Sequence, residues 1–190
     1  MRRAGPNKQG FLDGLCGIYA LTNFMRDWRV AGELFLSGTP GERSDTAFWM
    51  LLDAADRLRM LNPDYILTGY ASHHLAKIWN TLADEADLQC HAVLLSKLKR
   101  LGRNLTNIKV AECIYEENKA QALILLHNDH WYLSTGIDHG KLSVADSISR
   151  IEDRETLSAG VVNKPEVEGL AILQERSKIL ACVRKELERG

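Results

Sequence analysis

The sequence has no long hydrophobic run and almost no net charge. None of its apolar stretches approaches the roughly 18 residues that a membrane-spanning helix needs, so no membrane span is expected. Its 24 Lys and Arg residues oppose 25 Asp and Glu residues, and the formal net charge is −1. The chain therefore lacks the overall positive charge that attracts nucleic acid or anionic lipid. We expect neither a nucleic-acid partner nor a membrane partner.

Export signals and cysteine frameworks are also lacking. The basic start, residues 1–10, is followed by no apolar segment of the kind that a secretory signal contains. The four cysteines lie far apart and form no Cys-x-x-Cys pair. This spacing predicts reduced thiols, with no disulfide framework and no zinc site. We expect a cytoplasmic protein, and export by another route stays open.

What is present is the composition of an ordinary globular domain. The chain has 190 residues, of which 45% are hydrophobic and 26% charged. No internal repeat or long linker divides it, so we expect a single domain. Helical periodicity fills the first half and short apolar runs fill the second. Helices followed by strands predict an α+β fold, with a helical part over about residues 11–88 and a sheet part over about 89–150.

Three helices are expected in the first part, from apolar residues at helical spacing and from polar start signals. The first is expected over about Cys16 to Trp28. The second should begin at an N-cap, Ser44 or Asp45, and end at Pro63. The third should begin with Ser72 as its N-cap.

Strands are expected at "QCHAVLLS", at residues 122–127 and 131–137, and at "KLSVAD" after a turn at Gly140. The last three can pair as antiparallel neighbours. The tail carries apolar residues on one helical face, which predicts a C-terminal helix over about 167–189, although "GLAILQ" alone could form a strand.

Cys16 lies where a nucleophile is expected. It falls between Gly14 and Gly17 in "QGFLDGLCGIYALTN", where glycines let the backbone turn tightly and approach another chain closely. It also falls in the first turn of the expected helix, where unpaired N–H groups and the positive dipole end favour thiolate over thiol. A buried structural cysteine is the alternative.

His130 is the best candidate partner among the six histidines. In "NDHWYL" it lies where one apolar run ends and the next begins, so rigid elements can hold it beside a cleft. His73 and His74 are neighbours in a helical segment and are expected to point in different directions at the surface. A metal pair of His127 and His130 is an alternative, but no third ligand is well placed.

Asp146, at the end of "KLSVAD", is the expected orienting group. Antiparallel pairing through the turn brings the end of this strand beside the start of the His130 strand. A carboxylate that accepts from one imidazole nitrogen leaves the other nitrogen to take the thiol proton. A turn-capping role is the alternative for Asp146, and the other nearby orienting candidates are Asn128, Asp129 and Asp138.

Gln9 lies seven residues before Cys16. Its amide could donate a hydrogen bond to an oxyanion beside the backbone N–H of Cys16. Asp13 is a rival polar neighbour, and a solvated terminal residue is the alternative reading of Gln9.

These residues in this order resemble the papain-like cysteine peptidase superfamily. The pattern is a Gln, then Cys-Gly opening a helix, then His-Trp starting a strand, then Asp on the next strand. The stretches "LCGIYALTN" and "DHWYL" are most similar to compact members, which include Josephin deubiquitinases, bacteriocin-processing double-glycine peptidases and bacterial effector proteins. The resemblance covers about 30 residues of the chain, and the gap from Gln9 to Cys16 is one residue longer than in papain itself.

The resemblance implies a papain-like hydrolase that cleaves an amide or isopeptide bond of a protein or peptide, with no metal and no organic cofactor. Alternatives are a deamidase or acyl transferase acting on a protein partner, or a binding module without chemistry. The implied roles are catalysis for Cys16, His130 and Asp146, the oxyanion hole for Gln9, and support of the substrate cleft for Gly14, Gly17 and Trp131. Substrate specificity is expected in loops near 36–45, 62–72 and 96–108.

A basic cluster in "SKLKRLGRN" consists of Lys97, Lys99, Arg100 and Arg103. No stacking aromatics interleave with these residues, so a solvated polar segment is favoured over a nucleic-acid patch. An acidic partner protein is the other reading that the cluster allows.

Overall fold

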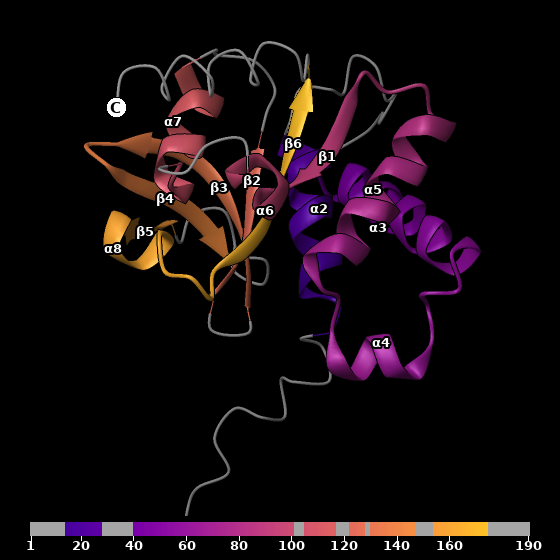
Figure 1. Cartoon of the computed structure of the whole chain (residues 1–190). Coiled ribbons are helices and arrows are strands. Elements are labelled where there is room, and N and C mark those ends of the chain that lie inside the picture. The colour runs from indigo at the N-terminus through magenta and orange to yellow at the C-terminus, as the bar shows by residue number, and fades with distance from the viewer. Residues whose placement is uncertain are drawn as a thin grey trace, which may run out of the picture.

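The protein combines a group of helices with a six-stranded antiparallel sheet (Figure 1). This arrangement confirms the predicted α+β class. The structure, a computed structural model, describes residues 14–27, 40–100, 105–116, 122–127, 130–146 and 154–174. Within these ranges no helix is long and apolar enough to cross a membrane.

Among the described residues, four helices precede the first strand and form the helical part. Three of them carry apolar faces that pack together and against the sheet. Their bounds are α2 Cys16–Asp27, α3 Pro40–Arg57, α4 Pro63–Thr68 and α5 Ser72–Glu85. The predicted helix end at Trp28 lies just outside the described residues.

Two predicted helix starts are wrong. α3 begins at Pro40, so Ser44 and Asp45 lie inside it and are not N-caps. Proline suits the first helical position because its fixed φ is already helical and its missing N–H would have no partner there. α5 begins at Ser72 itself, and Ala71 occupies the N-cap position.

α3 also ends before the predicted limit at Pro63. Its last residue is Arg57, and Arg59 then adopts a left-handed conformation with φ of 57°. The N–H of Met60 donates to the carbonyl of Ala55 at 2.8 Å, which closes the last turn without a glycine. Pro63 instead begins α4 within the expected loop over 62–72.

The sheet has the strand order β1-β6-β2-β3-β4-β5, and every pair is antiparallel. The strands are β1 Cys90–Leu94, β2 Ala122–His127, β3 His130–Asp138, β4 Lys141–Asp146, β5 Arg154–Ser158 and β6 Glu168–Gln174. The helices between them are α6 Leu95–Lys99, α7 Asn107–Glu116 and α8 Ala159–Val162.

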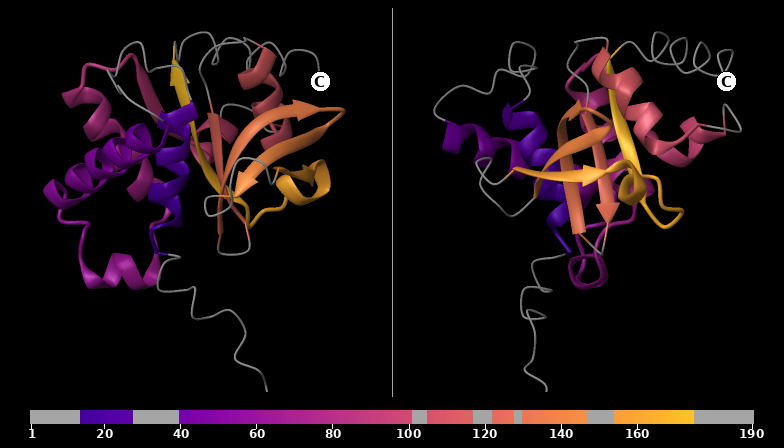
Figure 2. Two further views of the ribbon diagram at one scale, coloured as in Figure 1. Left: turned by 180° about the vertical axis from the view of Figure 1, so that it is seen from behind. Right: turned by 90° about the vertical axis from the view of Figure 1, so that its left-hand side faces the viewer.

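Helices cover both faces of this sheet, as Figure 2 shows from two further sides. Alternate residues of the central strands face opposite layers: Ile124 packs with α2, α3 and α5, whereas Leu123 and Leu125 pack with α6, α7 and α8. The sheet therefore separates two apolar cores, and the core on the α2 side contains Cys16.

The predicted C-terminal helix is wrong over the part that the structure describes. Residues Glu168–Gln174 form β6, which lies between β1 and β2, as the alternative strand reading of "GLAILQ" allowed. A short run buried on both faces has no readable period, so helix and strand look alike. At Gly169 an added Cβ would lie 2.5 Å from the carbonyl oxygen of Ile124, so the close pairing requires glycine. Residues 175–190 lie outside the described part.

The predicted loop over 96–108 instead contains α6 and the start of α7, and residues 101–104 lie outside the description. Within this polar segment, Leu95 and Leu98 are three residues apart, so they lie on one side of α6, and both pack in the core. Of the loop predicted at 36–45, residues from Pro40 onward belong to α3.

The hairpin of β3 and β4 matches the predicted turn at Gly140. His139 and Gly140 have φ of 45° and 72°, which is the two-residue turn whose twist suits antiparallel strands. A register shift between Ser134 and Gly136 then sets the pairing toward the start of β3, where Tyr132 lies opposite Asp146.

Candidate active site

Cys16 is the first residue of α2, and its side chain is fully buried. The N-terminal N–H groups of a helix have no intrahelical acceptor, and the dipole places partial positive charge there. Both features stabilise a thiolate relative to a thiol. α2 packs against the sheet beside β3.

His130 is the first residue of β3 and is half-buried. Its Nδ1 lies 3.9 Å from the Sγ of Cys16, although the two residues are 114 positions apart in the chain. Its ring also contacts the ring of Tyr132 edge-on, with centroids 5.4 Å apart. The two residues that the sequence proposed as nucleophile and base are therefore side by side.

Gly14 and Gly17 are buried where α2 meets α4 and α5. A Cβ at position 14 would lie 1.8 Å from the carbonyl oxygen of Ile66, and one at position 17 would lie 2.5 Å from a methyl group of Leu75. Both glycines thus allow a close approach within the protein itself, and their predicted approach to another chain and support of a substrate cleft stay predictions. The segments that approach them are α4 and α5 of the helical part, and these segments hold the start of α2 in place.

Trp131 is also buried, with 3% of its surface exposed. Its indole N–H donates to the backbone carbonyl of Tyr70 at 3.2 Å, which ties β3 to the segment before α5. The side chain packs in the same core as Cys16. Trp131 is therefore a core residue beside the site, and its support of a substrate cleft stays a prediction.

Asp146 ends β4 and is the cross-strand partner of Tyr132. His130 lies two residues along β3 from Tyr132, and such diagonal positions are roughly 7–8 Å apart in an antiparallel pair. The backbone of Asp146 is thus near His130, as predicted, whereas its side chain lies outside the described part. Whether it orients the imidazole stays a prediction.

Of the remaining predicted residues, one is excluded from the site and four lie outside the described part. Asp138 ends β3, eight residues or roughly 27 Å from His130 along an extended strand. Its side chain is exposed beside His139, so Asp138 is excluded as the orienting group. The predictions for Gln9, Asp13, Asn128 and Asp129 lie outside the described residues.

His73 and His74 differ from the expectation that they point in different directions. Their rings are in contact, with centroids 3.8 Å apart. His74 accepts a hydrogen bond from the N–H of Ala71 at its Nδ1 and meets the ring of Tyr65 edge-on. Burial, followed by the nearby His73 and Lys77, lowers the pKa of His74 below 6.5.

The alternative metal pair is close in space, because His127 and His130 are cross-strand partners. Among the described residues, however, no three His, Cys, Asp or Glu side chains gather as metal ligands. The pair has no third ligand there.

Tyr132 and Tyr70 are neighbours of the site that the sequence reasoning missed. Tyr132 could have been found, because residues two apart on a strand share a face and His130 was already named. Tyr70 had no such signal. Its hydroxyl donates to the carbonyl of Met60 at 2.9 Å, and burial raises its pKa to about 12.

Comparisons of the chain with family models, with curated proteins and with solved structures find no match.

Proposed function

We propose that the protein is a thiol hydrolase that cleaves an amide or isopeptide bond of a protein or peptide, with a papain-like arrangement of groups. The proposal rests on the 3.9 Å separation between the Sγ of Cys16 and the Nδ1 of His130. The position of Cys16 at the start of α2 supports it. A cysteine and a histidine in this relation are the minimum for nucleophilic catalysis by sulfur.

In the proposed reaction, His130 takes the thiol proton at Nδ1 and the thiolate attacks the carbonyl carbon. The N–H of Cys16, with Gln9 as predicted from the sequence, stabilises the oxyanion. The carbon–nitrogen bond then breaks, the imidazolium gives its proton to the leaving amine, and a thioester remains on Cys16. Water, activated by His130, attacks the thioester, releases the acid and restores the thiol.

Deamidation and acyl transfer use the same thioester. In a deamidase the leaving amine is ammonia from a glutamine side chain, and in a transferase an amine takes the place of water. The same pair of residues supports all three reactions, so the choice among them depends on the substrate tested.

The burial of Cys16 favours a second candidate, a papain-like binding module without chemistry. A thiol with 0% of its surface exposed cannot meet a substrate unless neighbouring groups shift on binding. Buried cysteine is also common as a small apolar residue.

A test of function begins with thiol reactivity. Iodoacetamide labelling followed by mass spectrometry compares Cys16 with Cys90 and Cys113, which are buried as well. A hydrolase predicts that Cys16 reacts fastest and that His130→Ala slows this reaction alone. Equal slow labelling at all three positions would favour the binding module.

The second step is a screen on peptide, isopeptide-linked ubiquitin-like and glutamine substrates. Turnover should vanish in Cys16→Ser and persist in Cys113→Ser, which serves as the matched control. Activity that survives Cys16→Ser would overturn the proposal.

A further inference from the structure

A surface groove runs between α5 and the segment formed by β1 and α6. Two adjoining hollows, of about 330 and about 500 Å³, share His73 and Leu94 in their walls. Lys77 and Lys97 line the larger hollow, and Lys99 lines the smaller one. We call this feature the α5–α6 groove.

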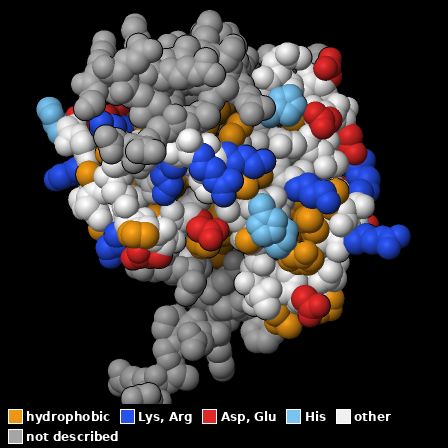
Figure 3. All heavy atoms as spheres, viewed as in Figure 1, with side chains coloured by type: hydrophobic (Ala, Val, Ile, Leu, Met, Phe, Trp, Pro, Cys, Tyr) orange, Lys and Arg blue, Asp and Glu red, His pale blue; other side chains and the backbone are white. Residues whose placement is uncertain are grey.

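The lining of the groove carries more lysines than carboxylates, and these lysines make no ion pair within the described residues. No ion pair joins Lys77, Lys97 or Lys99 to a carboxylate in the described part of the chain. Two acidic residues also line it, so its three lysines exceed the carboxylates by one charge: Asp84 contacts His91 at 3.0 Å, and Glu168 accepts from Ser72 at 3.1 Å. Figure 3 shows Lys and Arg side chains gathered across the middle of the face that Figure 1 presents.

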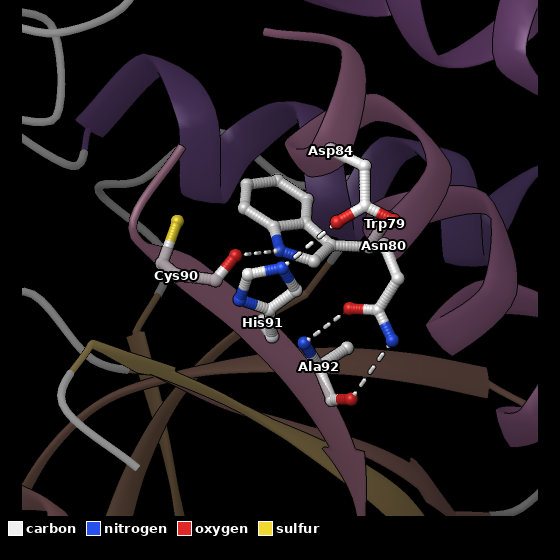
Figure 4. A network of polar contacts seen from close by, with 6 residues as sticks. All are labelled: Trp79, Asn80, Asp84, Cys90, His91 and Ala92. Atoms are coloured by element: carbon white, nitrogen blue, oxygen red, sulfur yellow. Dashed lines mark hydrogen bonds and ion pairs between the residues drawn. The ribbon is translucent and has the colours of Figure 1, made fainter. Parts of the chain in front are cut away.

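The floor of the groove is the edge strand β1, and α5 occupies its outward backbone groups (Figure 4). The amide of Asn80 accepts from the N–H of Ala92 at 2.6 Å and donates to its carbonyl at 3.1 Å. The indole of Trp79 donates to the carbonyl of Cys90 at 3.1 Å. A bound segment therefore cannot pair as an additional strand here, and recognition falls to the lysine side chains.

The smaller hollow lies close to the candidate active site. Glu168, in its wall, is the cross-strand partner of Leu126, which in turn is the partner of Trp131. Two strand spacings, roughly 10 Å, thus separate Glu168 from Trp131, and His130 is the next residue. An extended chain covers that distance with about three or four residues.

We propose that the α5–α6 groove binds an acidic, extended segment of the protein substrate, several residues away from the bond that is cleaved. Charge complementarity points to this occupant, because the walls hold three lysines that make no ion pair with any carboxylate in the described ranges. That this segment belongs to the substrate rests on the proposed function, whereas the binding of an acidic segment does not.

Binding is tested without turnover, on the full chain carrying Cys16→Ala. The probe is a fluorescein-labelled ten-residue peptide of alternating Glu and Ser, and its anisotropy is measured at about 50 mM salt, where surface charges are weakly screened. Lys77→Glu and Lys97→Glu should each weaken binding about fivefold to tenfold. Lys141→Glu, an exposed change of the same charge on β4, should alter it less than about twofold.

Equal weakening by Lys97→Glu and Lys141→Glu would overturn the proposal, because the peptide would then respond to net charge alone. Tighter binding of single-stranded RNA, with the same dependence on Lys77 and Lys97, would also overturn it in favour of a nucleic-acid site. Peptide binding in the groove by a protein that hydrolyses nothing would support the groove and contradict the hydrolase. Hydrolysis of acidic and neutral substrates at equal kcat/KM, unchanged by Lys97→Glu, would support the hydrolase and contradict the groove.

Discussion

The indole N–H of Trp131 donates to the backbone carbonyl of Tyr70 at 3.2 Å, in the core that also contains Cys16. This hydrogen bond joins the strand that begins with His130 to the segment that precedes α5. It therefore holds the helical part and the sheet together within one residue of the candidate base. A loss of this bond should change both stability and the relation between His130 and Cys16.

We expect Trp131→Phe to lower the free energy of unfolding by about 1–3 kcal/mol, because the carbonyl of Tyr70 would stay buried without its donor. Urea unfolding followed by circular dichroism measures this change. Thiol labelling of Cys16 should also slow, since the start of β3 loses its anchor. Unchanged stability would show that water or another group replaces the indole.

Asp146→Ala should leave the protein folded and lower turnover, because His130 loses the group that selects its tautomer and supports its cation. The loss can approach the roughly 10⁴-fold seen when a triad aspartate is replaced by asparagine, and a thiolate already favoured by a helix start will reduce it. Steady-state kinetics on the best substrate of the screen measures it.

Cys16→Ser and His130→Ala should each remove detectable turnover, and adding Asp146→Ala to either should cost little more, because the groups act together. If Asp146→Ala unfolds the protein while activity per folded molecule is retained, Asp146 is a turn residue. Asn128 and Asp129 would then be the orienting candidates to test.

Gly14→Ala should lower the free energy of unfolding by at least about 1–3 kcal/mol, as overpacking does in a filled core. The new methyl group would lie 1.8 Å from the carbonyl oxygen of Ile66, so α4 or the start of α2 must move. Gly136→Ala is the matched control, because nothing lies within 4 Å of its new Cβ. Chemical unfolding of both variants measures the difference, and an equal effect at the two positions would contradict this account.

Stability should fall with acidification through His74. Its pKa is lowered below 6.5 in the folded protein, first by burial and then by His73 and Lys77. Because the unfolded chain binds the proton more readily, the contribution is fully present above pH 6.5 and is lost as the pH falls from 6.5 toward the lowered value. Protonation of Nδ1 also removes the acceptor for the N–H of Ala71.

The urea midpoint should therefore drop between about pH 7.5 and pH 5 in the wild type, and drop less in His74→Gln, which does not titrate there. His139→Gln is the control, since His139 is almost fully exposed on the β3–β4 turn. A pH dependence that His74→Gln leaves intact would assign the effect to other groups.

Local sequence alone determined the helix that begins at Cys16, the strands around residues 122–146 and the turn at Gly140. Each depends on neighbours in the chain: apolar residues at helical spacing in α2, apolar runs in β2 and β3, and a glycine that tolerates positive φ. Pro40 was also a local signal for the start of α3. The prediction instead chose Ser44 or Asp45, because these residue types are the stronger N-caps.

Only the tertiary structure decided where β6 lies and what α6 contributes. The run "GLAILQ" becomes a strand because it pairs with both β1 and β2. The paired residues are 42 (168 − 126) to 84 (174 − 90) positions apart, and no local period encodes such contacts. The Lys-rich segment becomes α6 because Leu95 and Leu98 find a core on the far face of the sheet.

For the candidate site, the sequence predicted Cys16 and His130 from their positions at the start of a helix and of a strand. Their 3.9 Å separation exists because α2 packs against the sheet, with Gly14 and Gly17 fitted closely to α4 and α5. The burial of Cys16 also arises from this packing. Side-chain chemistry is local to the sequence, whereas distance and exposure are set by contacts between segments far apart in the chain.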